Sequence, residues 1–110
     1  MDIRQIGDGI AVAGQITVED IAEIAALGYR TLISNRPDSE AGAVSHEEIR
    51  AAAEAAGITF HYIPVVSGAM TGDDVAAMAE AVRSAERPLL AYCRSGTRSA
   101  TLLREALGDD

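Results

Sequence analysis

The sequence predicts an α/β fold, with a small parallel sheet of four to five strands and helices on both of its faces. Short β-prone runs alternate with helical patterns along the chain, as expected for crossover connections onto a parallel sheet. One helix-start pattern, a Thr or Ser followed by acidic residues, recurs three times and places the helices. The length of 110 residues suits one domain with its own core, so we expect residues 1–110 to fold as a single unit.

The first strand and the first helix are expected near the N-terminus. Residues 10–13 are apolar and β-prone, and we expect them to form a strand at an edge of the sheet. In residues 16–21, Thr17 and an acid three residues later suit a capping box, between two isoleucines that suit a hydrophobic staple. Gly28 suits the position just after the end of this helix. Residues 29–35 then supply the next strand.

The same pattern places the next two helices. Residues 44–49 and residues 70–75 each combine a hydroxyl residue with acids in the first helical turn. The first of these helices should end at Gly57, and a strand at residues 58–63 follows it. The second helix is expected over residues 73–85.

The last strand and the last helix depart from this pattern. An apolar strand at residues 88–92 is followed by a helical pattern at residues 99–107. The first turn of this helix contains no acid, because the first acidic residue is Glu105. Arg94 and Arg98 stand before it instead. Three helices balance their positive N-terminus with their own carboxylates, whereas this helix is left free for an anion from outside.

The loop between this strand and this helix reads Cys-Arg-Ser-Gly-Thr-Arg-Ser over residues 93–99 and holds the only cysteine of the chain. Its amides and the helix N-terminus converge on one spot, with the sulfur at its floor. Such a cradle binds an anion and lowers the pKa of the thiol, so we expect Cys93 to be a nucleophile that is largely thiolate near neutrality. The alternative is a buried structural cysteine. The residues expected to bind the anion are Arg94, Ser95, Gly96, Thr97 and Ser99 of the loop, with Arg36 from a neighbouring loop.

Other candidate residues follow the neighbouring strands. Ligands collect at the carboxyl ends of the strands in such sheets, so the loops after the last three predicted strands should share one rim. This places Arg36, Asp38 and the loop of residues 64–70 near Cys93. Asp38 is a candidate for a displaced general acid, and the alternative is that it caps a turn. His46, in the first turn of its helix, is expected at the surface.

The composition narrows the classes of function. A net charge of −8 argues against nucleic acid as a partner. One cysteine and two histidines exclude an internal disulfide and disfavour a zinc site, so we expect no metal and no cofactor. No apolar run approaches the ~20 residues that span a bilayer, and the N-terminus lacks a signal-peptide pattern. We therefore expect a cytoplasmic location and no membrane partner.

Four motifs occur in order within residues 2–107: Ala13-Gly14-Gln15-Ile16, Asn35-Arg36-Pro37-Asp38, Ile63-Pro64-Val65 and the cysteine loop of residues 93–99. Together they resemble the phosphatase-like domain of beta-lactamase-hydrolase-like proteins, a family also described as small sulfurtransferases. The resemblance implies a fold like that of dual-specificity cysteine phosphatases. It also implies a partner, because relatives are fused to a metallo-β-lactamase-type domain that looks like a persulfide dioxygenase.

The resemblance leaves two chemistries open at the cysteine. Cysteine phosphatases have a His before the cysteine, five residues between the cysteine and the arginine, and an Asp on a neighbouring loop as general acid. Here Tyr92 stands before the cysteine, and only four residues separate Cys93 from Arg98. Residues 65–67, Val-Val-Ser, align with the place of the acid. Without an acid, cleavage of a phosphate ester is slower by ~10²–10⁴-fold.

Rhodanese-like sulfurtransferases, by contrast, resemble this chain in the length and the sequence of the loop, Cys-Arg-x-Gly-x-Arg-Ser. We therefore predict a sulfurtransferase that moves sulfane sulfur from thiosulfate or a low-molecular-weight persulfide to a thiol acceptor, through a persulfide on Cys93. Cys93 and Arg98 are the expected catalytic residues, and Arg98 holds the negative group of the donor. A cysteine-based phosphatase that forms a phosphocysteine is the alternative. A non-catalytic carrier module for persulfides or anions is the third interpretation.

Overall fold

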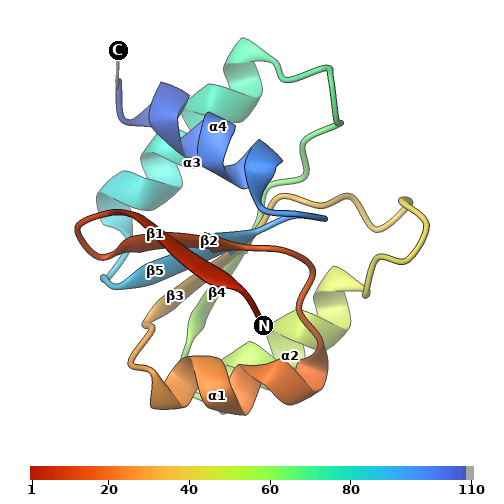
Figure 1. Cartoon of the computed structure of the whole chain (residues 1–110), viewed down its shortest axis with the longest axis vertical. Helices are drawn as coiled ribbons and strands as arrows, with labels where there is room; N and C mark the ends of the chain where they lie inside the picture. The colour runs from red at the N-terminus through yellow and green to blue at the C-terminus, as the bar shows by residue number, and fades with distance from the viewer. Residues whose placement is uncertain (109–110) are drawn as a thin grey trace.

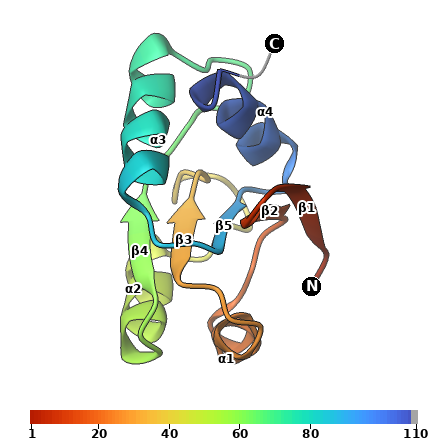
Figure 2. The ribbon, with the colours of Figure 1, turned by 90° about the vertical axis from the view of Figure 1, so that its left-hand side faces the viewer.

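The computed structural model describes residues 1–108, which form a five-stranded sheet between two layers of helices (Figure 1, Figure 2). The strands are β1 (Ile3–Gly7), β2 (Ile10–Ala13), β3 (Thr31–Ser34), β4 (Thr59–Tyr62) and β5 (Leu89–Tyr92). They lie in the order β1-β2-β5-β3-β4. β1 pairs with β2 in antiparallel fashion, and all other neighbours pair in parallel. The predicted α/β fold with a small, mostly parallel sheet is confirmed.

Helices cover both faces of the sheet (Figure 2). They are α1 (Ile21–Ala26), preceded by the short 3-10 helix η1 (Val18–Asp20), then α2 (His46–Ala55), α3 (Gly72–Ser84) and α4 (Thr97–Ala106). α1 and α2 pack on one face over a core that includes Ile24, Leu32 and Ile49. α3 and α4 pack on the other face over a core that includes Met78, Leu89 and Leu103. Burying a side chain of this size contributes roughly 1.5–3 kcal/mol. Within residues 1–108, no helix is long and apolar enough to cross a membrane.

The helix starts form as the capping patterns predict. η1 and α3 each begin with a capping box, and the Ser45 hydroxyl accepts a hydrogen bond from an amide in the first turn of α2. These contacts satisfy amides that have no partner inside a helix. Gly28 and Gly57 follow α1 and α2 with φ values of 96° and 79°, as predicted for residues that end a helix.

The expectation that Ile10–Ala13 lies at an edge of the sheet is wrong, because β1 pairs with β2 and takes the edge position. The register of this pair shifts between Gln5 and Gly7. This irregularity breaks the alternation of apolar and polar residues by which a strand is recognised. The dipeptide Asp8-Gly9 was the available signal, since it favours a tight hairpin turn. β1 also pairs backbone groups that β2 would otherwise expose.

β5 lies in the middle of the sheet and positions the cysteine loop. It pairs with β2 on one side and with β3 on the other, so that Tyr92 is level with both Ala13 and Ser34. These three strands run in the same direction and end at the same edge. The segments that follow them, including Cys93, therefore meet at one rim, as the sequence predicts.

Candidate active site

Cys93 follows β5 directly and lies at the floor of the loop that leads into α4. The residue is buried, with an exposed fraction of 1%. The amide of Gly96 donates a hydrogen bond to the Cys93 Sγ at 3.1 Å. The amide of Cys93 itself donates to the carbonyl oxygen of Ala13 on β2 at 3.3 Å. The sheet thus fixes the backbone of the cysteine, while the loop curls around its sulfur.

The surroundings of the thiol favour its charged form. Burial raises the pKa of the Cys93 thiol, but hydrogen bonds from the amide and hydroxyl of Ser99 and from the amides of Ser95 and Gly96 lower it. The lowering prevails, so the pKa lies below the ordinary value of a cysteine. These donors belong to the start of α4, whose first turn holds no acidic residue. Helix-terminal amides stabilise an anion, so the loop favours the thiolate in the direction that the sequence predicts. That Cys93 is largely thiolate near neutrality stays a prediction.

Gly96 makes the curl of the loop possible. Its φ of 92° lies in the left-handed region that favours glycine. A Cβ at this position would lie 2.6 Å from Arg4 Nη2 and 3.3 Å from the carbonyl group of Ala13. The same Arg4 Nη2 donates to the carbonyl oxygen of Ser95 at 3.3 Å. The edge strand β1 therefore supports the loop from its outer side and leaves no room for a larger residue.

A cavity of about 890 Å³ opens over the cysteine loop. The predicted site residues that line it are Arg36, Cys93, Arg94, Ser95, Thr97 and Arg98. The loop after β4 adds Val66, Ser67, Gly68 and Met70. Gly96 and Ser99 are buried at the base of the loop, where their amides face the sulfur. The structure thus brings three loops together at one rim, and the chemical roles assigned to these residues stay predictions.

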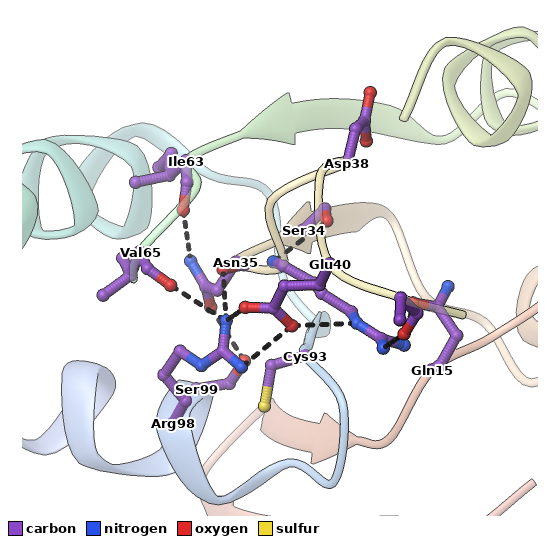
Figure 3. A network of polar contacts seen from close by, with 12 residues as sticks. Gln15, Ser34, Asn35, Asp38, Glu40, Ile63, Val65, Cys93, Arg98 and Ser99 are labelled. Atoms are coloured by element: carbon purple, nitrogen blue, oxygen red, sulfur yellow. Dashed lines mark hydrogen bonds and ion pairs between the residues drawn. The ribbon is translucent and has the colours of Figure 1, made fainter. Parts of the chain in front are cut away.

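Glu40, which the sequence analysis did not single out, also lines the cavity. Its carboxylate accepts hydrogen bonds from Arg98 Nη1 at 2.8 Å and Nη2 at 3.2 Å, and from Arg36 Nε at 3.0 Å. Figure 3 shows this carboxylate beside the Arg98 guanidinium. Hydrogen bonds from Arg98 lower the pKa of Glu40, desolvation raises it, and Arg36 lowers it again, with a net pKa below the usual range. Glu40 is therefore an anion at neutral pH.

Both arginines also donate hydrogen bonds to groups other than Glu40. Arg98 Nη1 donates to the carbonyl oxygen of Val65 at 2.8 Å. Arg36 Nη1 donates to Gln15 Oε1 at 3.0 Å, and its Nη2 donates to the carbonyl oxygen of Ala41 at 2.6 Å. The Arg98 Nε is buried and has no hydrogen-bond partner within residues 1–108. The two guanidiniums are thus fixed in the cavity wall, and the negative charge of Glu40 offsets part of their positive charge.

Asn35 ties the cysteine loop to the neighbouring strands (Figure 3). Its Nδ2 donates to the carbonyl oxygen of Ile63 at 3.0 Å, which fixes the orientation of the amide group. Its Oδ1 therefore faces Ser99, whose hydroxyl donates to it at 2.8 Å. A hydroxyl has a single proton to donate. Asn35 therefore competes with the Cys93 sulfur for the single proton of the Ser99 hydroxyl, whereas the backbone amides of the loop remain available to the sulfur.

Asp38 does not line the cavity. Its Oδ1 accepts a hydrogen bond from the amide of His46 at 3.0 Å, and its Oδ2 lies 2.6 Å from His46 Nδ1. The His46 ring stacks on Tyr62 with a centroid distance of 3.8 Å. The Tyr62 hydroxyl accepts a hydrogen bond from the Asp38 amide at 3.0 Å. Asp38 thus fastens its loop to the start of α2, a contact that neither interpretation of this residue from the sequence predicted.

Glu40 is the one acidic residue among those that line the cavity. Since its carboxyl is ionised and paired with two arginines, it cannot protonate a leaving group at neutral pH. Val66 and Ser67, aligned with the general acid of phosphatases, do line the cavity but carry no proton donor of that strength. Burial raises the pKa of Tyr92 to about 12. The cavity therefore contains a thiol of lowered pKa and no carboxyl that is protonated at neutral pH.

The fold defines a class of protein: domains with the architecture of the cysteine phosphatases of the tyrosine and dual-specificity type. A candidate phosphatase from Neisseria meningitidis matches with a TM-score of 0.82 and 37% identity, over 90% of this chain and 71% of that chain. The core catalytic domain of the PP-IP phosphatase Siw14 from S. cerevisiae matches with a TM-score of 0.72, over 92% of this chain and 61% of that chain. At 15% identity, this second match shows the fold alone.

The chain belongs to the phosphatase-like domain family of beta-lactamase hydrolase-like proteins, whose model matches residues 2–108. A beta-lactamase hydrolase-like protein from Agrobacterium fabrum is 36% identical in an alignment of 110 positions, which covers 97% of this chain and 26% of that protein. Another, from Xylella fastidiosa, is 33% identical over 103 residues, which are 93% of this chain and 24% of that protein. The chain thus spans about a quarter of the length of these relatives.

The family resemblance and the fold that it implies are confirmed by these matches. The matches favour the phosphatase alternative over sulfur transfer. The matching family is described as a phosphatase-like domain, and the two matching structures are described as phosphatases. None of these relatives is named for sulfur transfer. What is shown is an enzyme fold of the cysteine-phosphatase type. The choice between the two reactions depends on the chemistry of the cavity.

Proposed function

We propose that this domain is a cysteine-dependent group-transfer enzyme, and that the group it carries on Cys93 is sulfane sulfur. The observation that supports this choice is the state of the one acid in the cavity. Glu40 is an ion-paired anion, so a leaving group has to depart without a proton. Sulfite and thiolates leave readily as anions, whereas the alkoxide of a phosphate monoester requires protonation.

The proposed reaction has two displacement steps. In the first, the Cys93 thiolate attacks the outer sulfur of thiosulfate or of a low-molecular-weight persulfide. A new sulfur–sulfur bond forms at Sγ, the bond within the donor breaks, and its electron pair leaves on sulfite or on a thiolate. In the second step, the thiolate of an acceptor attacks the outer sulfur of the Cys93 persulfide, and the electron pair of the broken bond returns to Cys93. The reaction requires no metal, cofactor or oxidant.

The amides of the cysteine loop suit both steps. The Gly96 amide already donates to Sγ at 3.1 Å. Together with its neighbours it stabilises the thiolate before the attack and the charged persulfide after it. Burial of Cys93, which is 1% exposed, keeps the persulfide away from bulk water. The cavity then serves as the path by which donor and acceptor reach the sulfur in turn.

A phosphatase that forms a phosphocysteine on Cys93 is the second candidate, and the fold comparisons favour it. In that reaction the thiolate attacks phosphorus, an alkoxide leaves, and water then releases phosphate. The absence of a protonated carboxyl in the cavity counts against it, because loss of the acid slows ester cleavage by ~10²–10⁴-fold.

The acceptor and the partner are parts of the same proposal. The curated relatives are much longer than this chain, which covers 26% and 24% of their lengths. We propose a low-molecular-weight thiol as the acceptor. A metallo-β-lactamase-type persulfide dioxygenase is the partner that we expect to consume the persulfide product.

Mass spectrometry distinguishes the candidates. The protein is incubated with thiosulfate, with a short alkyl persulfide or with an aryl phosphate, and the peptide that contains Cys93 is analysed. We expect a gain of one sulfur atom that an added thiol removes with turnover, and no gain in Cys93→Ser. A sulfur gain without turnover would identify a carrier module. Ester cleavage at ~1 s⁻¹ or faster, with no sulfur adduct, would identify a phosphatase.

A further inference from the structure

Glu40 controls the charge of the cavity over Cys93. Its carboxylate binds both Arg36 and Arg98, and Figure 3 shows it directly beside the Arg98 guanidinium. The side chains of the two arginines are 6% and 12% exposed, and that of Glu40 is 25% exposed. Charges sheltered to this degree are screened less by water and salt than those on an open surface.

The charges near the sulfur are balanced before any donor enters. When Cys93 is ionised, as it is when it attacks, Arg36 and Arg98 contribute two positive charges, and the thiolate and Glu40 contribute two negative ones. Arg94 also lines the cavity, but its side chain is exposed and its charge is well screened. An entering anion therefore meets a neutral set of charges. Each further negative charge that it brings raises the electrostatic cost of binding.

We propose that Glu40 is a specificity-determining residue, which makes the cavity accept sulfur donors with one negative charge at most, such as alkyl persulfides, in preference to dianions such as thiosulfate. The inference rests on the proposed function, because it names the donor class of the same site. The Arg98 guanidinium already donates hydrogen bonds to Glu40 and to the carbonyl oxygen of Val65. Only part of its hydrogen-bonding capacity is therefore left for a dianion.

An alkyl persulfide is suited to such a site. Its terminal sulfur carries a single charge when ionised and none when protonated. The thiolate of Cys93 attacks that sulfur, and the alkyl thiolate departs with the electron pair of the broken bond. Thiosulfate presents two negative charges within a few ångströms of Glu40 and of the attacking thiolate. Without Glu40, the two arginines and the Cys93 thiolate would leave one net positive charge, which offsets one of the two charges of thiosulfate.

The test compares donors of different charge in wild-type protein and Glu40→Gln. The second-order rate of persulfide formation on Cys93 is measured with thiosulfate and with 2-hydroxyethyl persulfide. We expect the ratio of the thiosulfate rate to the alkyl persulfide rate to rise about tenfold or more in Glu40→Gln. Glu86→Gln is the matched control, because it removes the same charge from an exposed pair with Arg30, and its ratio should not change. Equal changes with both donors in Glu40→Gln would overturn the proposal.

A second measurement separates this inference from the proposed function. The rates at which iodoacetate and iodoacetamide alkylate Cys93 report the charge of the cavity without any sulfur transfer. The ratio of the anionic to the neutral reagent should rise in Glu40→Gln and stay constant in Glu86→Gln. If wild-type protein forms no persulfide with any donor, the proposed function fails, whereas an unchanged alkylation ratio in Glu40→Gln contradicts the role of Glu40.

A third measurement requires no variant, and it applies if Glu40→Gln does not fold. Nitrate and sulfate are inert anions with one and two charges. In wild-type protein, nitrate should protect Cys93 from iodoacetamide at a lower concentration than sulfate does. Stronger protection by sulfate would show that the cavity prefers dianions and would overturn the proposal.

Discussion

α3 and α4 pack side by side on one face of the sheet, but their N-termini are built in opposite ways (Figure 1). At α3, the Thr71 hydroxyl accepts a hydrogen bond from the Asp74 amide at 3.1 Å, and Asp74 Oδ2 accepts one from the Thr71 amide at 3.0 Å. At α4, the N-cap residue is Gly96, and the first turn holds no acid. The Gly96 amide binds the Cys93 sulfur instead.

The difference separates a helix start that serves stability from one that serves reactivity. A side-chain cap of the kind at α3 stabilises a protein by about 1 kcal/mol. α4 lacks that contribution, and its free amides hold down the pKa of the thiol. A missing cap next to a nucleophile is therefore a functional feature.

Thr97→Asp gives α4 the acid that it lacks, and we expect the largest effect from it. Thr97 is exposed in the first turn and lines the cavity. A carboxylate there competes for the helix amides and repels the thiolate, so the pKa of Cys93 should rise toward its ordinary value. Below its pKa, a thiol reacts in proportion to its thiolate fraction. The rate of iodoacetamide alkylation at pH 7 should therefore fall about tenfold.

The pH profile of the alkylation rate shows directly in which direction the pKa of Cys93 moves. In wild-type protein the rate falls as the pH drops through the pKa of Cys93, which lies below that of an ordinary thiol. In Thr97→Asp the midpoint should move to higher pH, and in Thr97→Asn, which adds no charge, it should stay. Equal midpoints in wild-type protein and Thr97→Asp would show that the helix amides do not control the thiol.

Gly96→Ala tests whether the loop requires glycine at the N-cap of α4. The φ of 92° is strained for alanine, and its Cβ would crowd the carbonyl group of Ala13. We expect a loss of about 1–3 kcal/mol in the free energy of unfolding and a slower alkylation of Cys93. Gly28→Ala is the matched control, because Gly28 has φ 96° with no atom within 4 Å of an added Cβ. If Gly28→Ala lowers the free energy of unfolding as much as Gly96→Ala does, crowding at the N-cap of α4 does not contribute to the loss.

Thr71→Ala removes the cap of α3 and should affect stability alone. The variant loses the hydrogen bond to the Asp74 amide. We expect the free energy of unfolding, measured by urea denaturation, to fall by about 1 kcal/mol. The pKa of Cys93, measured by alkylation, should not change. A shifted thiol pKa would mean that the two helix starts are coupled through their packing.

Asp38→Asn should have the smallest effect on catalysis. Asp38 binds His46 and does not line the cavity. We expect the rate of sulfite release from thiosulfate and any rate of phosphate-ester cleavage each to change by less than about twofold, whereas loss of a general acid would slow ester cleavage by about 10²-fold or more. A loss of that larger size would assign Asp38 a part in proton transfer after all.

Much of the fold follows from local chemistry that the sequence displays. The capping patterns at Thr17, Ser45 and Thr71 place three helix starts, and the alternation of strands and helices predicts the parallel sheet. β1 could not be recognised by alternation, because its register shifts between Gln5 and Gly7. The hairpin that joins it to β2 depends on one dipeptide, a weaker signal than a repeated pattern.

The candidate site was predictable where its residues are consecutive and unpredictable where they meet through the fold. The cysteine loop is a single run of sequence, and its place after a central strand fixes the rim. Glu40 lies in an irregular loop, and its partner Arg98 is 58 residues away. No periodicity connects such residues. The available signal was electrostatic, since Arg36 and Arg98, expected at one rim, required a buried countercharge.

The central position of β5 has a consequence for the order in which this protein becomes active during synthesis. β2 and β3 each pair with β5 and are not neighbours of one another in the sheet. While the ribosome is still adding residues before 89, both strands lack their partner, and the early part of the chain cannot close its sheet. Cys93 and the amides that activate it emerge only after that strand. In the nascent chain, the amides that lower the pKa of Cys93 can therefore assemble only once β5 is present to pair with β2 and β3.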